Sequence, residues 1–180
     1  MNHVASTIPQ LIEKFAAATA NEQAGILKHN AISVTEFEQY ATWSEEGYTR
    51  NCIFRNADFE FILLCWQPGA ITAIHGHGGQ DCWVYQVDGE VQEERFDRED
   101  NAFISTAKMV LRAGRLSYMN DQMGYHAIQN TSTSRAMTLH IYASPIERCM
   151  VFNPKTNCFE VRELEYDSVG IPKAAVQSAV

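Results

Sequence analysis

The chain has 180 residues and a formal net charge of −8, and 46% of its residues are hydrophobic. This length fits a single domain, residues 1–180, that can bury roughly 70% of the surface exposed by its unfolded form. The chain is acidic and has no basic clusters, no apolar run of membrane-spanning length and no signal-peptide pattern. These features argue against nucleic-acid and membrane partners. The five cysteines form no CxxC pair, so we expect reduced thiols in a cytoplasmic monomer, with Cys52, Cys65 and Cys158 as small core residues.

Residues 1–45 are predicted to be helical. Thr7 can cap a first helix, and Pro9 is tolerated in its first turn. Five apolar residues would share one face of this helix: Ile8, Leu11, Ile12, Phe15 and Ala18. Asn21 and Ser33 are candidate caps of two further short helices. We expect these helices to cover one end of a sheet and to carry no chemistry.

Residues 46–170 alternate short apolar segments with turns, which predicts a mainly β fold. The expected strands are Tyr48–Phe54, Glu60–Trp66, Cys82–Val87, Glu90–Phe96, Phe103–Leu111, Leu116–Met119, His126–Asn130, Ala136–Ala143, Cys149–Phe152 and Cys158–Leu164. Asp88-Gly89 is expected to close a tight hairpin, and charged Asp97–Asn101 to form a loop. Short strands with frequent turns are typical of a small β-barrel or a jelly-roll sandwich, here with the N-terminal helices packed on it. Residues 171–180 would form a fraying tail.

The segment from Gly69 to Gly89 has the spacing Gly-x5-His-x-His-x4-Cys-x6-Gly. His75 and His77 lie two residues apart, so both imidazoles can converge on one metal ion from a single strand end. This spacing resembles the first motif of the cupin superfamily, with Cys82 at the position where most cupins carry a metal-binding Glu.

A third metal ligand should come from a later strand, and His126 and His140 are the two candidates. Gly114-x11-His126-x3-Asn130 is close to the second cupin motif, with one extra residue. His140 instead alternates with Thr138 and Tyr142, and side chains two apart in a strand share a face. We therefore interpret His126 as the ligand and His140 as part of a hydrogen-bonding row beside the metal.

Beyond these motifs, the chain resembles the thiol dioxygenases, and specifically the cysteine dioxygenase type I family, over most of its length. The matching segments are Tyr48-Thr49-Arg50-Asn51, Leu63-Leu64-Cys65-Trp66, Ile74-His75-Gly76-His77, Gly124-Tyr125-His126 and Leu139-His140-Ile141-Tyr142, together with Cys82 and Cys149. Several such segments in the expected order are much more specific than any one of them.

The resemblance implies that His75, His77 and His126 hold one ferrous iron, Fe(2+). Three neutral imidazoles leave the ion its full charge and three open positions, which differs from the usual arrangement of two histidines and one carboxylate. L-cysteine could then contribute a thiolate and an amine, leaving a position for O₂. The implied reaction converts L-cysteine to cysteine sulfinic acid.

The resemblance also implies a substrate site. Arg50 would bind the substrate carboxylate, because a guanidinium offers a planar fork of donors, with Tyr48 and Cys149 nearby. In the same family, the residues at the positions of His140 and Thr138 orient the tyrosine at the position of Tyr142.

Cys82 and Tyr142 stand at the positions that are joined by a thioether cross-link in the mammalian enzymes. Many bacterial relatives have Gly at the position of Cys82, so the cysteine permits this cross-link without requiring it.

Three other functions remain open at this point. A 3-mercaptopropionate dioxygenase needs no amine ligand and typically has Gly where this chain has Cys82, so Arg50 together with Cys82 favours cysteine. A non-catalytic cupin would bind a ligand without turning it over. A metal-dependent cupin isomerase or lyase would normally retain the motif Glu, which is absent here.

Overall fold

The computed structural model of the chain describes residues 4–99 and 102–170. Its helices are α1 (Ile8–Ala17), α2 (Ala20–Lys28), α3 (Val34–Glu38) and the short 3-10 helix η1 (Asp121–Met123). Its strands are β1 (Tyr48–Arg55), β2 (Glu60–Trp66), β3 (Cys82–Asp88), β4 (Glu90–Glu99), β5 (Ala102–Arg112), β6 (Leu116–Met119), β7 (Tyr125–Gln129), β8 (Ala136–Tyr142), β9 (Arg148–Asn153), β10 (Cys158–Glu163) and β11 (Ser168–Val169). None of the helices in the described ranges is long and apolar enough to cross a membrane.

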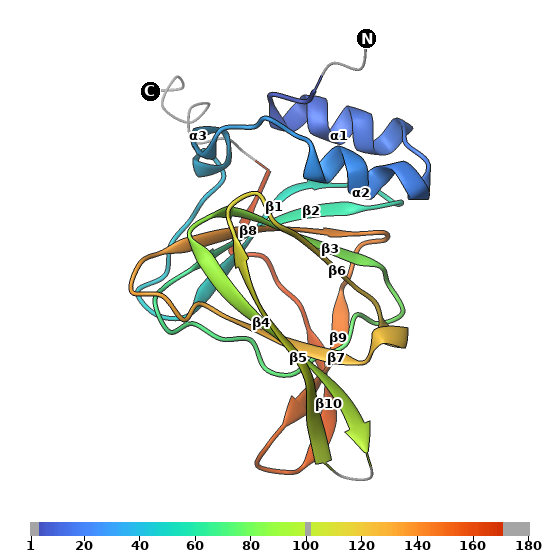
Figure 1. Ribbon diagram of the computed structural model, residues 1–180, viewed down its shortest axis with the longest axis vertical. Helices are drawn as coiled ribbons and strands as arrows, with labels where there is room; N and C mark the ends of the chain where they lie inside the picture. Colours follow the sequence, from blue (N-terminus) through green and yellow to red (C-terminus); the bar gives the residue numbers. More distant parts are fainter. Residues whose placement is uncertain (1–3, 100–101, 171–180) are drawn as a thin grey trace.

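The strands form two sheets and a hairpin. The large sheet has the order β11-β1-β2-β8-β3-β6, the small sheet has the order β5-β4-β7, and β9 pairs with β10. Figure 1 shows the helices on one side of the large sheet and the β9–β10 hairpin at the opposite end of the molecule. The predicted mainly β fold with N-terminal helices is confirmed in its sandwich form, because the described sheets do not close into a barrel.

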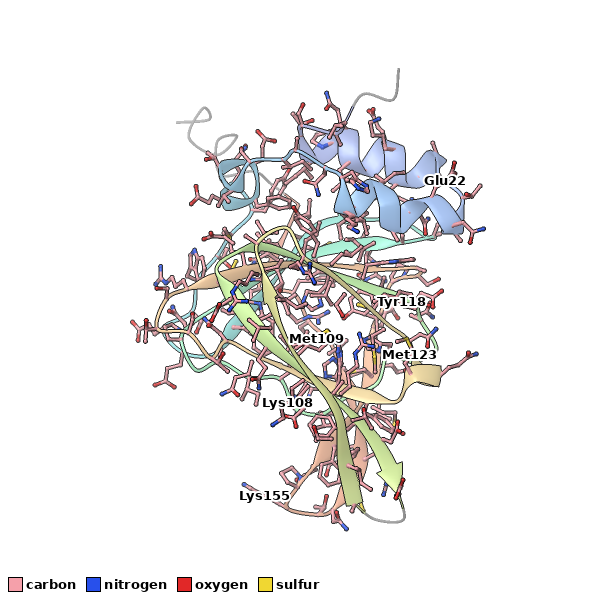
Figure 2. The ribbon with its side chains drawn as sticks, viewed as in Figure 1. Glu22, Lys108, Met109, Tyr118, Met123 and Lys155 are labelled. Carbon is pink, nitrogen blue, oxygen red and sulfur yellow. The ribbon has the colours of Figure 1, made fainter. Side chains whose placement is uncertain are left out.

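The helices cover a face of the large sheet, whereas the sequence suggested that they cover one end of it. All seven residues of β2 are buried, and apart from Glu60 their side chains are apolar on both faces of the strand. On one face, the ring of Phe61 lies 5.3 Å from that of Phe15 in α1, centroid to centroid. On the other face, Ile62 and Leu64 pack into a second core between the two sheets. Figure 2 shows side chains filling the space between the ribbons and labels Met109, which packs against this core.

The helix caps agree with the sequence in two cases and differ in one. Thr7 caps α1 by accepting a hydrogen bond from the Gln10 N–H, and Ser33 precedes α3. The cap of α2 is Thr19 and not Asn21. The Thr19 N–H and hydroxyl both donate to Glu22, at 2.9 and 2.7 Å, and this reciprocal pairing fixes the start of the helix.

Asp88-Gly89 does not close a hairpin. β3 pairs with β6 and β8, and β4 pairs with β5 and β7, so the chain passes from one sheet to the other at this point. Gly89 has a φ of +69°, and a Cβ there would lie 2.8 Å from the carbonyl oxygen of Arg135. The glycine is therefore required by a close approach of two backbones where the chain changes sheets.

Three further differences concern segments near the ends of strands. Asp97–Glu99 extend β4 where a loop was expected, because they pair with the start of β5. β11 was not predicted, and it pairs in parallel with β1. Cys158 is exposed, whereas Cys52 and Cys65 are buried as expected. The expected loop residues 100–101 and the expected tail, 171–180, lie outside the described residues.

Candidate metal centre and substrate pocket

Three histidines from two separate segments meet at one point. His75 lies in the extended segment between β2 and β3, and its backbone exchanges hydrogen bonds of 3.0 and 3.1 Å with that of His126 on β7. Their Nε2 atoms are 3.2 Å apart. With His77, one ring nitrogen of each imidazole lies within 4.8 Å of the others. The structure thus brings together the three histidines that the sequence had singled out as ligands.

Hydrogen bonds orient two of these imidazoles. The Nδ1 atom of His75 lies 2.9 Å from the Ala73 carbonyl oxygen, and that of His126 lies 2.9 Å from Glu93 Oε1. Because a carbonyl and a carboxylate oxygen only accept hydrogen bonds, the protons are on Nδ1. In the neutral imidazoles, the facing Nε2 atoms then carry lone pairs that can be shared by one cation.

His77 completes the case for a metal ion. It is fully buried, and neither of its ring nitrogens has a hydrogen-bond partner among the described residues. A buried polar atom without a partner is costly, and a metal ion would provide the missing interaction. Three imidazole nitrogens suit a divalent first-row transition metal, so the residues present fit such an ion.

The electrostatics of the cluster favour metal binding. Burial lowers the pKa of His75 to about 3, with a further contribution from neighbouring His126. Burial also lowers the pKa of His77, again helped by His126. Both imidazoles are therefore neutral near pH 7 and can offer lone pairs to a metal ion without first losing a proton.

Two carboxylates that the sequence motifs did not indicate hold two of the candidate ligands in place. Asp121 on η1 accepts hydrogen bonds from the backbone N–H groups of His77 and Gly79, at 2.5 and 2.6 Å. A Cβ at Gly76 would lie 3.1 Å from Asp121 Oδ1, so glycine lets the carboxylate approach this segment closely. The carboxylate thus closes the glycine-rich segment around the ligand His77.

Glu93 plays the corresponding part for His126. It is fully buried on β4, accepts from the Ser117 hydroxyl at 2.5 Å, and lies 3.4 Å from Arg95 Nε. Burial raises the pKa of Glu93, but the hydrogen bonds from His126 and Ser117 and the charge of Arg95 outweigh it, so the net pKa is lowered. The sequence did contain a signal for this residue. Glu93 lies two residues after the apolar Val91, so in a strand it shares the inward face of β4, where a charged side chain needs a partner.

The row on β8 lies beside the three imidazoles and does not join them. Thr138, His140 and Tyr142 are all buried. The Thr138 hydroxyl accepts from Trp66 Nε1 at 2.8 Å and lies 2.9 Å from His140 Nε2, to which it can donate its own proton. Trp66 thus takes part in the row, which the sequence did not indicate.

Cys82 and Tyr142 face each other directly across the β3–β8 ladder. Side chains at such positions have Cβ atoms about 4.5–5.5 Å apart. The Tyr142 ring lies 6.2 Å from that of His77, centroid to centroid. Burial raises the pKa of the Cys82 thiol. Burial also raises the pKa of the Tyr142 hydroxyl, with a further contribution from the neighbouring Cys82. Both groups therefore keep their protons near pH 7.

A cavity of about 50 Å³ reaches the cluster of three imidazoles at His75, which forms part of its wall. Its polar lining includes all three residues predicted to bind substrate together with parts of the metal site and the row: Tyr48, Arg50, His75, His140, Tyr142 and Cys149. Its apolar walls include Leu64, Ile128, Ile146 and Val151. One water needs roughly 10–15 Å³ of such space, so the cavity suits a small molecule.

Arg50 has a free edge at this cavity. Its Nε donates to the Glu165 carbonyl oxygen at 3.2 Å, while its buried Nη2 has no partner within the described residues. An unpartnered guanidinium nitrogen in a cavity wall is suited to an anionic ligand. Arg162 also lines the cavity, directly opposite Cys149 in the β9–β10 ladder. It was missed because a single arginine on an exposed strand gives no signal in the sequence.

Comparison with known proteins adds a family and a fold. A family model described as cysteine dioxygenase type I matches residues 1–155. The chain is 31% identical over 160 residues to the cysteine dioxygenase type 1 of Homo sapiens, covering 85% of this chain and 80% of the human protein.

Two solved structures are similar in fold alone. A conserved protein from Klebsiella pneumoniae with a double-stranded β-helix domain has a TM-score of 0.51 at 17% identity, covering 63% of this chain and 83% of that one. A protein from Thermus thermophilus has a TM-score of 0.50 at 23% identity, covering 60% and 93%. The double-stranded β-helix is the fold of the cupins, which agrees with the predicted fold class.

Proposed function

The chain belongs to the cysteine dioxygenase type I family and is a thiol dioxygenase, and we propose that it uses ferrous iron and O₂ to oxidise L-cysteine to cysteine sulfinic acid. The observation that carries this proposal is the meeting of two features at one small cavity. One is the cluster of three imidazoles with lone pairs available, and the other is the unpartnered guanidinium edge of Arg50.

The metal would be held by His75, His77 and His126. Ferrous iron bound there supplies the redox chemistry of O₂ and lowers the pKa of a coordinated thiol. The protein contributes preorganisation, because Glu93 and Asp121 hold two of the ligands by hydrogen bonds of 2.5–2.9 Å. No separate general base is needed for the thiol.

Arg50 would bind the substrate carboxylate through its free Nη edge and so fix the orientation of the thiol. Tyr48 and Cys149 line the same cavity and restrict the size of the substrate. The apolar walls lower the local dielectric constant, which strengthens the interaction between the guanidinium and a carboxylate. These features favour a small thiol that carries an acid group.

Tyr142 would donate a hydrogen bond from its hydroxyl to the group that reacts in the cavity. Its raised pKa keeps the proton on the hydroxyl oxygen near pH 7. His140 and Thr138, with Trp66 behind them, would hold this end of β8 in a fixed arrangement through hydrogen bonds of 2.8 and 2.9 Å.

We also propose that Cys82 and Tyr142 can become joined by a thioether. The bond would form between the cysteine sulfur and a carbon of the phenol ring, with loss of the thiol hydrogen and one ring hydrogen and transfer of two electrons to O₂. Their directly opposed positions on β3 and β8 support this pairing. The cross-link would restrict the rotamers of Tyr142, which saves ordering entropy on the order of 1 kcal/mol.

For the chain as a whole, we propose one domain that acts as a cytoplasmic monomer. The N-terminal helices and the large sheet share one hydrophobic core, which supports a single domain. Cys52, Cys82, Cys149 and Cys158 are free thiols, which supports a reducing compartment.

An oxygen-electrode assay of the Fe(2+)-loaded protein tests the proposed function. L-cysteine, 3-mercaptopropionate, cysteamine and a peptide with an N-terminal cysteine are compared, and sulfinate products are identified by mass. We expect the highest kcat/KM for L-cysteine. A clear preference for 3-mercaptopropionate would reassign the substrate, and ligand binding without oxygen uptake would indicate a non-catalytic protein.

A further inference from the structure

The segment Leu164–Asp167, which we call the strap, follows β10 and lies outside the residues matched by the family model. Leu164 nevertheless lines the cavity, and the residues after it run alongside Arg50. The strap therefore belongs to the part of the cavity in which the substrate carboxylate would be bound.

The strap is attached to Arg50 by its backbone and by a side chain. The Arg50 N–H donates to Asp167 Oδ2 at 2.7 Å, and the Asp167 N–H donates to the Arg50 carbonyl oxygen at 2.8 Å. The Glu165 carbonyl oxygen accepts from Arg50 Nε. Beyond the strap, β11 pairs with Asn51 and Cys52, which holds the strap against β1.

Tyr166 and Glu60 anchor the middle of the strap. The Arg50 Cζ atom lies 6.0 Å from the centroid of the Tyr166 ring, within the range of a cation–π contact. The Tyr166 hydroxyl donates a short hydrogen bond to Glu60, which is fully buried. The other carboxylate oxygen of Glu60 accepts from the Ile146 N–H at 2.9 Å. A buried carboxylate needs such partners, and this one has no part in the proposed reaction.

These contacts leave only one edge of the Arg50 guanidinium for a ligand. The Nε atom is occupied by the strap, so the side-on fork of Nε and one Nη is not available. Nη2 is buried and unpartnered, and two parallel hydrogen bonds to a carboxylate can therefore come only from the end formed by the two Nη atoms.

We propose that Glu60 and Tyr166 are positioning residues for Arg50, and that the strap they anchor makes the cavity select thiols whose carboxylate binds end-on to the two Nη atoms. This inference rests on the proposed oxidation of a thiol in this cavity. It assigns carboxylate selection to the strap as well as to Arg50, because the strap determines which guanidinium edge faces the ligand.

Steady-state kinetics of Tyr166 variants test the inference. Tyr166→Leu removes the ring and the hydroxyl, and we expect KM for L-cysteine to rise about tenfold, or about 1.4 kcal/mol, with kcat changed less than about twofold. Tyr166→Phe keeps the ring and loses the hydroxyl, which donates to Glu60 and accepts from Arg55 Nη1 at 3.4 Å, so its effect should be smaller. Glu60→Gln can still accept from Ile146 and exchange a hydrogen bond with Tyr166, so it should retain a KM near that of the native protein. Cysteamine, which lacks a carboxylate, should keep its KM in every variant.

Tyr118→Phe is the matched control. It removes a bond of the same kind, from the Tyr118 hydroxyl to Asp81 Oδ1 at 2.5 Å, and Tyr118 does not line the cavity. Its side chain is labelled in Figure 2. We expect no change in KM for either thiol in this variant.

Equilibrium binding of L-cysteine and cysteamine to the metal-loaded variants under nitrogen separates this inference from the proposed function, because binding reports on Arg50 whether or not the thiol is oxidised. An unchanged affinity for L-cysteine in Tyr166→Leu, or an equal loss for cysteamine, would overturn the role of the strap. Selective loss of L-cysteine binding in a protein that consumes no O₂ would instead support the strap and refute the dioxygenase.

Discussion

Replacing Glu93 by Leu should weaken metal binding from a position that does not touch the metal. The change removes the acceptor 2.9 Å from His126 Nδ1, so the imidazole is no longer held in the tautomer and orientation that present Nε2. Loss of such a partner typically costs 10–100-fold in metal affinity, or about 1.4–2.7 kcal/mol. Glu93→Gln keeps an oxygen acceptor, and we expect it to lose less than about tenfold.

The same substitution should also lower the free energy of unfolding of the metal-free protein. Ser117 loses its acceptor at 2.5 Å, and Arg95, whose side chain is only 16% exposed, loses the carboxylate 3.4 Å away. Breaking a buried pair on one side costs about 3–5 kcal/mol, and the partial exposure of Arg95 places the expected loss near about 3 kcal/mol.

Competition against a chelator under nitrogen measures the metal affinity, and urea unfolding measures the stability. Glu94→Gln is the matched control, because Glu94 is the next residue of β4 and its carboxylate pairs with exposed Lys108 at 3.1 Å. A surface pair of this kind contributes about 0–1 kcal/mol, and the metal affinity should not change. If Glu93→Leu binds the metal as tightly as Glu94→Gln does, the argument that Glu93 orients the ligand His126 is wrong.

Three other sets of experiments test the remaining parts of the site. Arg50→Ala should raise KM for L-cysteine about a hundredfold, since losing a charged contact in a desolvated pocket costs about 2–5 kcal/mol. KM for cysteamine should change little. Equal increases in KM for both thiols in the oxygen-electrode assay would mean that Arg50 has a structural role. His126→Ala should remove most of the metal measured by elemental analysis, whereas His140→Ala should retain the metal and lose rate; the reverse pattern would exchange their roles. Incubation of the iron-loaded protein with L-cysteine and air should produce chains lighter by two hydrogens, with peptide mapping placing the link between Cys82 and Tyr142. Cys82→Gly should abolish that mass change and keep measurable activity, and a link that never forms during turnover would leave Cys82 as a thiol of the pocket wall.

Local patterns in the sequence were sufficient for most of the strands and for part of the site. Glu60–Trp66 was predicted with the bounds that β2 has, because its run of apolar residues favours a strand buried on both faces. Thr138, His140 and Tyr142 were expected to share a face, because side chains alternate along a strand. The spacing of His75 and His77 is likewise a local property, which is why both could be singled out before the fold was known.

The tertiary structure decided what these local elements meet. Asp88-Gly89 carries the same turn signal whether the next strand folds back or enters another sheet, and only long-range strand pairing distinguishes the two. Glu93 lies 33 residues before His126, and the Glu165 carbonyl oxygen that binds Arg50 lies 115 residues after it. Turn and strand preferences act over a few neighbouring residues, whereas such partners are brought together by the packing of the two sheets. Local sequence therefore determined most of the elements of this protein, and the tertiary structure determined which side chains complete its site.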